Sequence, residues 1–207
     1  MFFFHWEDFN NEIINNWKDI TRTLLSIPMA HQLIGFYTVA DDTDNVLKVM
    51  RSYQYYAANK ISDVVAKTDW TNPNTRGGYV WHTTGSGKTM TSFKSAQLIA
   101  NSKDADKVIF LMDRIELGTQ SLDEYQNFAD NKDDVSGTEN TKDLITQMKD
   151  DQNVLIVSHG MTIRNMLHEL IPEFSLNTFL GKGSVSIVRY QDGHYHLDSF
   201  NQLDDFD

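Results

Sequence analysis

The 207-residue chain contains no cysteine, and it has far fewer basic than acidic side chains. Without cysteine, this chain has no disulfide, no thiolate nucleophile and no cysteine-based zinc site. Its 18 lysine and arginine residues stand against 29 aspartate and glutamate residues, which gives a formal net charge of -11. That balance excludes a broad basic surface for nucleic acid, so any contact with DNA must be local or supplied by a larger assembly.

Long apolar runs are also missing. The apolar residues 1–4 are soon followed by Glu7 and Asp8, so this start is too short and too acidic for a signal peptide or a membrane span. A hydrophobic content of 40% still suffices for a packed core. We therefore expect a globular cytoplasmic protein that makes no contact with a membrane.

The most informative stretch is residues 82–89, which read His-Thr-Thr-Gly-Ser-Gly-Lys-Thr. It follows the aromatic and β-branched residues 78–81, expected to be a strand, and opens an apolar pattern expected to form a helix from Gly87 to about Ile99. A strand, a glycine-rich loop and a helix in this order are typical of a phosphate-binding loop. Nucleotide binding is the first hypothesis.

The residue types in this loop suit that chemistry. Glycines let the backbone wrap a phosphate chain, while backbone N–H groups and the helix N-terminus supply positive potential. Lys88 is expected to contact the terminal phosphates, and Thr89 is expected to hold Mg²⁺. Because the strict pattern has glycine where this chain has His82, a polar turn that only caps a helix stays open as the alternative.

Strand and helix patterns alternate downstream of the loop. The apolar run 107–112 suits a strand buried on both faces, and residues 154–157 suit a further strand. Helical patterns cover residues 115–128 and 144–148 between them. This alternation predicts an α/β fold with a parallel, doubly wound sheet.

Helical patterns also precede the loop. Apolar residues within 8–28 follow a helical spacing that is expected to end at Pro28, and residues 53–66 fit a second helix. The polar residues 40–45 between them are expected to form a hairpin-like loop.

These segments together resemble the motor (R) subunit of type I restriction endonucleases, whose helicase-like domain carries the sequence Trp-His-Thr-Thr-Gly-Ser-Gly-Lys-Thr. The other matching segments follow the order of that family: 3–6 after the nuclease domain, 49–54 as the adenine-recognition motif, 112–117 as motif Ia, and 136–141 as the segment after it. The resemblance implies an incomplete RecA-like P-loop ATPase lobe over residues 46–150, with a three-layer parallel sheet, preceded by a helical connector over residues 1–45.

The family implies ATP-driven translocation on double-stranded DNA coupled to cleavage, in a complex with methyltransferase and specificity subunits. This chain shows no nuclease site, no Asp-Glu-x-His motif and no second motor lobe. Since phosphoryl transfer depends on positioning and charge neutralisation, we expect an ATP-binding fragment with little ATPase or nuclease activity alone.

The resemblance also implies site residues. Arg114 is a possible DNA contact, although it is equally suited to an ion pair at a strand end, and Gln54 would read the base. The residues implied to bind ATP and Mg²⁺ are Gln54, Thr84, Gly85, Ser86, Gly87, Lys88 and Thr89, with Thr89 on the metal.

Residues 151–207 resemble a different family, the C-terminal part of the histidine phosphatase (phosphoglycerate mutase-like) superfamily. A strand leads into Ser-His-Gly at 158–160 and a helix, and a final hairpin is expected to turn at Asp192-Gly193. The resemblance implies that His159 contacts a phosphoryl group, but the nucleophilic Arg-His-Gly of that family does not occur in the chain. The alternative interpretation is that His159 is an ordinary polar residue at the end of a strand.

The sequence thus reads as a composite joined near residue 150. Three hypotheses stay open: an ATP-binding fragment of an R subunit, a non-enzymatic structural or interaction chimera with a vestigial loop, and a histidine phosphatase-like fragment. Fold compatibility at the join does not restore activity.

Overall fold

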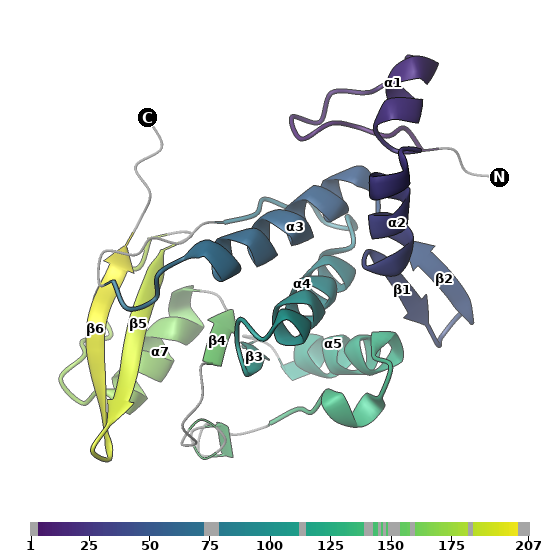
Figure 1. Cartoon of the computed structure of the whole chain (residues 1–207). Coiled ribbons are helices and arrows are strands. Elements are labelled where there is room, and N and C mark those ends of the chain that lie inside the picture. The colour runs from purple at the N-terminus through teal and green to yellow at the C-terminus, as the bar shows by residue number, and fades with distance from the viewer. Residues whose placement is uncertain are drawn as a thin grey trace. The chain divides into compact units, whose positions relative to one another are not determined.

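The structure is a computed structural model of the whole chain (Figure 1). It describes residues 4–72, 79–111, 115–138, 143–144, 146, 148, 154–157, 160–181 and 184–202. Its helices are α1 (Trp17–Arg22), α2 (Ile27–Gly35), α3 (Ser52–Lys67), α4 (Lys88–Ser102), α5 (Ile115–Phe128), the short 3-10 helix η1 (Lys132–Asp134) and α7 (Gly160–Leu170). Its strands are β1 (Thr38–Asp41), β2 (Val46–Val49), β3 (Lys107–Phe110), β4 (Val154–Val157), β5 (Val185–Gln191) and β6 (His194–Gln202).

The chain divides into two compact units, each built from separate stretches of sequence. The first unit comprises Met1–Ala66, Thr83–Ser102 and Ser121–Ser136, and the second comprises Lys67–His82, Lys103–Gln120 and Gly137–Asp207. No helix among the described residues combines the length and the apolar content that crossing a membrane requires.

An aromatic core holds the first unit together. The rings of Tyr37 and Tyr55 meet edge to face with centroids 4.6 Å apart, and Trp6 packs against Tyr55 at 6.2 Å. Met90 and Leu98 of α4 pack against the same cluster. Buried aromatic rings supply large apolar areas and prefer such tilted contacts, so this core fixes α4 relative to α3.

The N-terminal helices differ from the sequence expectation. The helical pattern over residues 8–28 gives only the short α1, and Pro28 lies in the first turn of α2 instead of ending a helix. The Ser26 side chain caps α2 by accepting a hydrogen bond from Met29 N at 3.4 Å. Proline suits this place because the first helical turn has no use for its missing N–H group.

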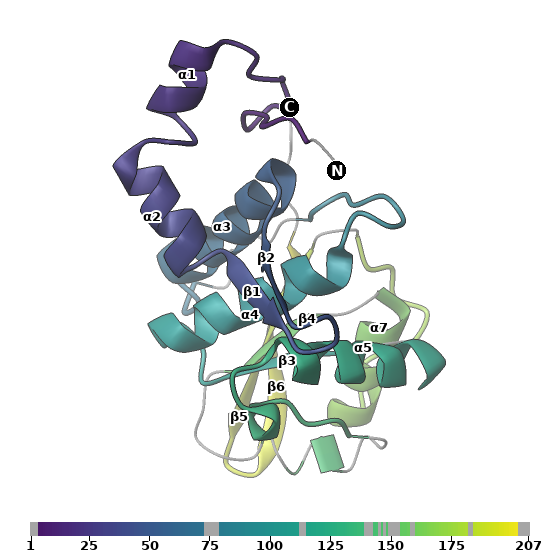
Figure 2. The ribbon, with the colours of Figure 1, turned by 90° about the vertical axis from the view of Figure 1, so that its right-hand side faces the viewer.

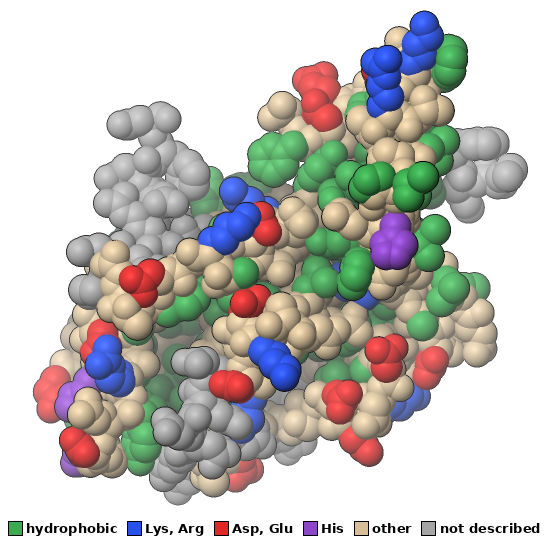
Figure 3. Space-filling view, in the orientation of Figure 1, with side chains coloured by type: hydrophobic (Ala, Val, Ile, Leu, Met, Phe, Trp, Pro, Cys, Tyr) green, Lys and Arg blue, Asp and Glu red, His purple; other side chains and the backbone are tan. Residues whose placement is uncertain are grey.

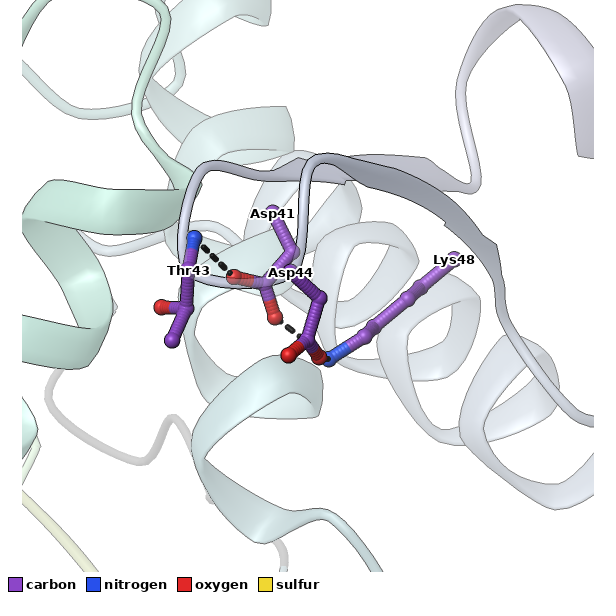
Figure 4. Close-up of polar contacts among 4 residues, drawn as sticks. All are labelled: Asp41, Thr43, Asp44 and Lys48. Carbon is purple, nitrogen blue, oxygen red and sulfur yellow. Dashed lines mark hydrogen bonds and ion pairs between the residues drawn. The ribbon is translucent and has the colours of Figure 1, made fainter.

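The expected hairpin-like loop at residues 40–45 is confirmed in part: residues 42–45 form the turn between β1 and β2, whereas Ala40 and Asp41 end β1 and pair antiparallel with Leu47 and Val46. Lys48 Nζ donates to the carboxylates of Asp41 and Asp44, and Thr43 N donates to Asp41 Oδ1 at 2.9 Å (Figure 4). The hairpin lies beside α4 (Figure 2). Lys94 of α4 bonds it there, since its Nζ donates to the Thr38 carbonyl at 2.9 Å.

In the second unit, β3 and β4 form a parallel pair in which Lys107 lies opposite Val154. The strands expected at 107–112 and 154–157 are thus confirmed for Lys107–Phe110 and Val154–Val157, although β3 is half-buried and not buried on both faces. The β5–β6 hairpin turns at Asp192 and Gly193, which have φ values of 52° and 83°. A two-residue turn with positive φ at both positions matches the expected turn there.

The core of the second unit lies between α7 and the β5–β6 hairpin. Leu167 and Phe174 are buried, and Phe174 meets Phe200 of β6 with ring centroids 5.2 Å apart. Ile156 of β4 and Leu197 of β6 pack against the same cluster. Residues after 150 therefore share one core with the second strand of the parallel pair.

The three-layer parallel sheet is not confirmed, because the described residues form three separate two-stranded sheets. The strand expected at 78–81 is wrong for its described residues, 79–81, which have no strand assignment. Trp81 is 79% exposed and Tyr79 is 61% exposed. Aromatic and β-branched side chains favour a strand only where they pack on a pleated, buried surface, and these side chains do not.

Asp41→Asn is expected to lower the free energy of unfolding at pH 7 by about 1 kcal/mol, because it removes a charged acceptor from Lys48. The hydrogen bond from Lys48 holds the pKa of the Asp41 carboxyl below its ordinary value. Because the folded-state pKa is lower than the unfolded-state pKa of about 3.9, the ionised carboxyl stabilises the folded state at pH values above 3.9. This stabilisation is lost as the pH falls toward the folded-state pKa. Thermal melts from pH 7 to pH 3 should show this loss in the wild type and not in Asp41→Asn.

Asp44→Asn is the matched control, since Asp44 bonds to the same lysine with a side chain that is 59% exposed, against 5% for Asp41. We expect a clearly smaller loss in this variant. Equal losses in the two variants would contradict a special role for the buried carboxylate.

Candidate functional site

A tight loop of the first unit leads into α4. The Thr83 carbonyl accepts hydrogen bonds from Ser86 Oγ at 2.7 Å, from Ser86 N at 3.4 Å and from Lys88 Nζ at 3.0 Å. Gly85 and Gly87 have φ values of 76° and 77°, which side chains with a Cβ rarely adopt. The two glycines therefore let the chain fold back on Thr83 before the helix begins at Lys88.

The beginning of α3 holds this loop by its backbone. The Ser86 carbonyl accepts hydrogen bonds from Tyr53 Oη at 3.1 Å and from Gln54 Nε2 at 3.2 Å. The other end of the Gln54 amide accepts a hydrogen bond from Arg51 N at 2.9 Å. Gln54 is only 3% exposed. Two segments 32 residues apart are thus joined at one carbonyl group.

The body of α4 is anchored on its other sides. Phe93 packs on Tyr125 and Phe128 of α5, with ring centroids 5.7 Å and 5.6 Å apart. The hydroxyls of Ser92 and Tyr125 lie 2.6 Å apart. Lys94 is buried, and burial lowers its pKa, while burial raises the pKa of Tyr125. These contacts make α4 a firm support for the loop at its N-terminus.

A pocket of about 230 Å³ lies beside the start of α3. The guanidinium carbon of Arg51 lies 3.8 Å from the centre of the Phe4 ring, so a cation and an aromatic face meet there. The volume is below the usual range for pockets that hold drug-sized ligands. The pocket is lined by Phe4, His5, Glu7, Arg51, Ser52 and Tyr53.

Comparison with known proteins identifies the family. Residues 53–170, more than half of the chain, match the family model of the SWI2/SNF2 ATPases. The chain belongs to the SWI2/SNF2 ATPase family. The matched residues include Gln54, the glycine-rich loop and α4. The contacts described above therefore lie within the matched range, apart from those made by residues before 53.

Curated relatives are endonuclease subunits of type I restriction enzymes. One from Staphylococcus saprophyticus is 39% identical over 163 residues, and one from Staphylococcus aureus is 38% identical over the same length. Each of these alignments covers 79% of this chain and 16% of the relative. A Mycoplasma pneumoniae protein, described as the C-terminal part of such a subunit, is 36% identical over 70% of this chain and 71% of its own length. The chain thus spans a small part of the staphylococcal relatives.

The length of the ATPase family match is relevant to the predicted join between two families near residue 150. It continues to residue 170, across the boundary near residue 150 where the sequence suggested a change of family. The resemblance of residues 151–207 to histidine phosphatases, and with it the chimera, is not supported. His159 and Arg114, the candidate phosphoryl and DNA contacts, both lie outside the described residues.

The structure brings several of the predicted site residues together. Gln54 bonds to Ser86, and Lys88 begins α4 with its ammonium group on the loop. Thr84 and Gly85 are exposed at the bend of the loop, and Thr89 is half-buried in the first turn of α4. Their role in binding ATP stays a prediction.

Neither the contact of the Tyr53 hydroxyl nor the pocket was predicted from the sequence. Tyr53 is the neighbour of Gln54 in the segment 49–54, and Phe4 is in the segment 3–6, so both lay inside segments already singled out. Among the residues that the structure describes, no three histidine, aspartate or glutamate side chains form a metal site. The expected contact of Thr89 with Mg²⁺ stays a prediction.

Gly87→Ala is expected to destabilise the first unit more than Gly85→Ala. Both glycines have positive φ, so alanine costs about 1 kcal/mol at either position. A Cβ at position 87 would also overlap Gln54 Nε2, whereas a Cβ at position 85 meets nothing within 4 Å. Urea denaturation should show a further loss of about 1 kcal/mol in Gly87→Ala, because the buried amide is displaced.

A double-mutant cycle separates the two costs. In a Gln54→Ala background, Gly87→Ala should be no more damaging than Gly85→Ala, because the overlapping amide is gone. An extra cost that persists in this background would show that Gln54 is not the group that excludes a side chain at position 87.

Proposed function

We propose that this chain binds ATP with Mg²⁺ as part of the motor of a type I restriction endonuclease R subunit. The observation that carries the proposal is the glycine-rich loop before α4, joined to the Gln54 segment through the Ser86 carbonyl within a SWI2/SNF2 ATPase family domain. The relatives named above support the assignment to a restriction enzyme.

The loop suits a triphosphate. Lys88 is exposed, and its ammonium group donates a hydrogen bond to the Thr83 carbonyl at 3.0 Å. An anionic phosphate oxygen is a stronger partner for an ammonium group than a neutral carbonyl. The first N–H groups of α4 supply further donors, and the Thr89 hydroxyl would hold Mg²⁺ on the phosphates. The bound Mg²⁺ would neutralise charge on the phosphate oxygens.

The pocket suits the base. Phe4 offers a ring on which a heterocycle can stack, and Arg51 and Glu7 offer polar groups of opposite charge at the same place. Arg51 and Tyr53 line the pocket, and Tyr53 and Gln54 bond to Ser86 of the phosphate loop. The short segment 51–54 therefore contacts both the pocket and the loop. ATP would span the two with its base in the pocket and its phosphates on the loop.

The wider activity follows from the family and not from this chain's own residues. The full assembly would translocate on double-stranded DNA with methyltransferase and specificity subunits. On the face shown in Figure 3, lysine and arginine side chains are scattered among acidic ones, and the net charge of the chain is -11. We therefore expect the chain by itself to bind DNA weakly, because its acidic side chains repel the phosphate backbone. Without an Asp-Glu-x-His motif, it binds ATP and turns it over slowly or not at all.

Lys88→Ala is expected to weaken binding of Mg-ATP by about 10- to 100-fold, because the variant loses a charge-assisted contact to the phosphates. Isothermal titration calorimetry with the purified chain measures the change. Lys60→Ala is the matched control, since Lys60 is an exposed lysine of α3 outside the loop. Equal affinities of wild type and Lys88→Ala, with both proteins folded in a thermal melt, would refute the proposal.

A further inference from the structure

Helix α2 exposes apolar side chains on the face that points away from the core. Leu33 is buried and Met29 packs against the aromatic core, so these two residues belong to the inner face of the helix. Ile27 and Ile34 are seven residues apart and therefore share the other face, where they are 86% and 74% exposed. A helix that is apolar all round is normally buried. The outer face of α2 is thus left uncovered by the part of the chain that the structure describes.

The outer side of the β1–β2 hairpin extends this surface. Side chains alternate along β2, so Leu47 and Val49 lie on the side opposite to Lys48 and to its strand partner Val39. Val39 is buried, whereas Leu47 and Val49 are exposed, as is Phe36 between α2 and β1. In Figure 3 hydrophobic side chains gather over α2 and beside it over the hairpin. This surface, the apolar face, comprises Ile27, Ile34, Phe36, Leu47 and Val49.

The lack of charge restricts what can cover the apolar face. No lysine, arginine, aspartate or glutamate occurs between Arg22 and Asp41, although 23% of the residues in the chain are charged. Nucleic acids and anionic membranes are bound through lysine and arginine, which α2 lacks. A charged protein surface would lose hydration here without gaining a partner. The occupant that fits is therefore an uncharged apolar surface.

We propose that the apolar face is a homodimer interface, covered by the same face of a second copy of this chain. The face is self-complementary, because an antiparallel pairing of two α2 helices about a two-fold axis places Ile27 of each copy against Ile34 of the other. The exposed area of its five side chains is on the order of 700 Å², close to the roughly 800 Å² per partner of a standard interface. This inference does not depend on the ATP site.

The net charge determines how this association responds to salt. Each copy has a formal net charge of -11, so two copies repel each other outside the apolar contact. Salt screens this repulsion and leaves the apolar contact intact. We therefore expect the dimer to become tighter as the NaCl concentration rises from about 0.05 M to about 0.5 M. An association through surface ion pairs would become weaker over the same range.

Sedimentation equilibrium of the whole chain measures the association. We expect wild type to dimerise with a Kd in the micromolar range, and Ile34→Glu to weaken the dimer by at least about 100-fold, because it buries a carboxylate in an apolar contact. Phe179→Glu is the matched control, since Phe179 is also 74% exposed but lies in the second unit. This variant should dimerise as wild type does. Thermal melts of both variants confirm that they are folded.

A pair of oppositely charged variants tests the antiparallel arrangement. Ile27→Lys alone should also be a monomer, because it buries an ammonium group. An equimolar mixture of Ile27→Lys and Ile34→Glu should form heterodimers, since the lysine of one chain would meet the glutamate of the other. A mixture that stays monomeric would overturn the proposed arrangement.

Three further results would overturn the proposal itself. The first is a wild-type chain that stays monomeric up to about 200 µM at high salt. The second is a dimer that Ile34→Glu leaves intact. The third is a monomer that binds phosphatidylcholine vesicles and loses this binding in Ile34→Glu, which would assign the face to a membrane surface. Mg-ATP affinity should be equal in wild type and Ile34→Glu, so failure of the interface is distinguishable from failure of the ATP site.

Discussion

The Ser86 carbonyl is held by Tyr53 and Gln54, and the arrangement of the candidate site depends on that contact. A glycine-rich loop has many accessible conformations, so ordering it is costly unless other groups restrain it. Here the restraint comes from side chains at the start of α3, more than thirty residues earlier in the chain. The same restraint explains why a side chain at position 87 has no room.

That restraint in turn requires α3 and α4 to stay in place. The cluster that includes Trp6, Tyr37 and Tyr55 packs α3 against residues from the N-terminal stretch and against Met90 of α4. Lys94 and Ser92 bond α4 to β1 and to Tyr125. Buried cations are costly, so Lys94 is tolerated because its ammonium group donates to the Thr38 carbonyl and to Gln97 Oε1. Residues before the family match thus help to hold α3 and α4, the two helices of the candidate site, in place.

The second unit is built on a parallel strand pair and a separate hydrophobic core. β4 pairs with β3, and α7 and the β5–β6 hairpin share one core beyond it. Family membership extends through α7, to residue 170. A parallel strand followed by a helix is a common unit of many α/β proteins, so a short apolar strand and a Ser-His-Gly sequence suited more than one family. This shared pattern explains why the sequence suggested a join near residue 150.

The sequence by itself determined the local features: the turn within residues 40–45, the helix beginning near residue 53, the glycine loop before α4, the strands Lys107–Phe110 and Val154–Val157, and the turn at Asp192-Gly193. These depend on periodicity, caps and positive φ, which neighbouring residues set. Only the tertiary structure decided that Pro28 lies in the first turn of α2 and that residues 79–81 do not form a strand. It alone placed the Gln54 amide on the Ser86 carbonyl and formed the pocket around Phe4. Those outcomes depend on partners far away in the chain, and side-chain packing selects such partners where local pattern does not.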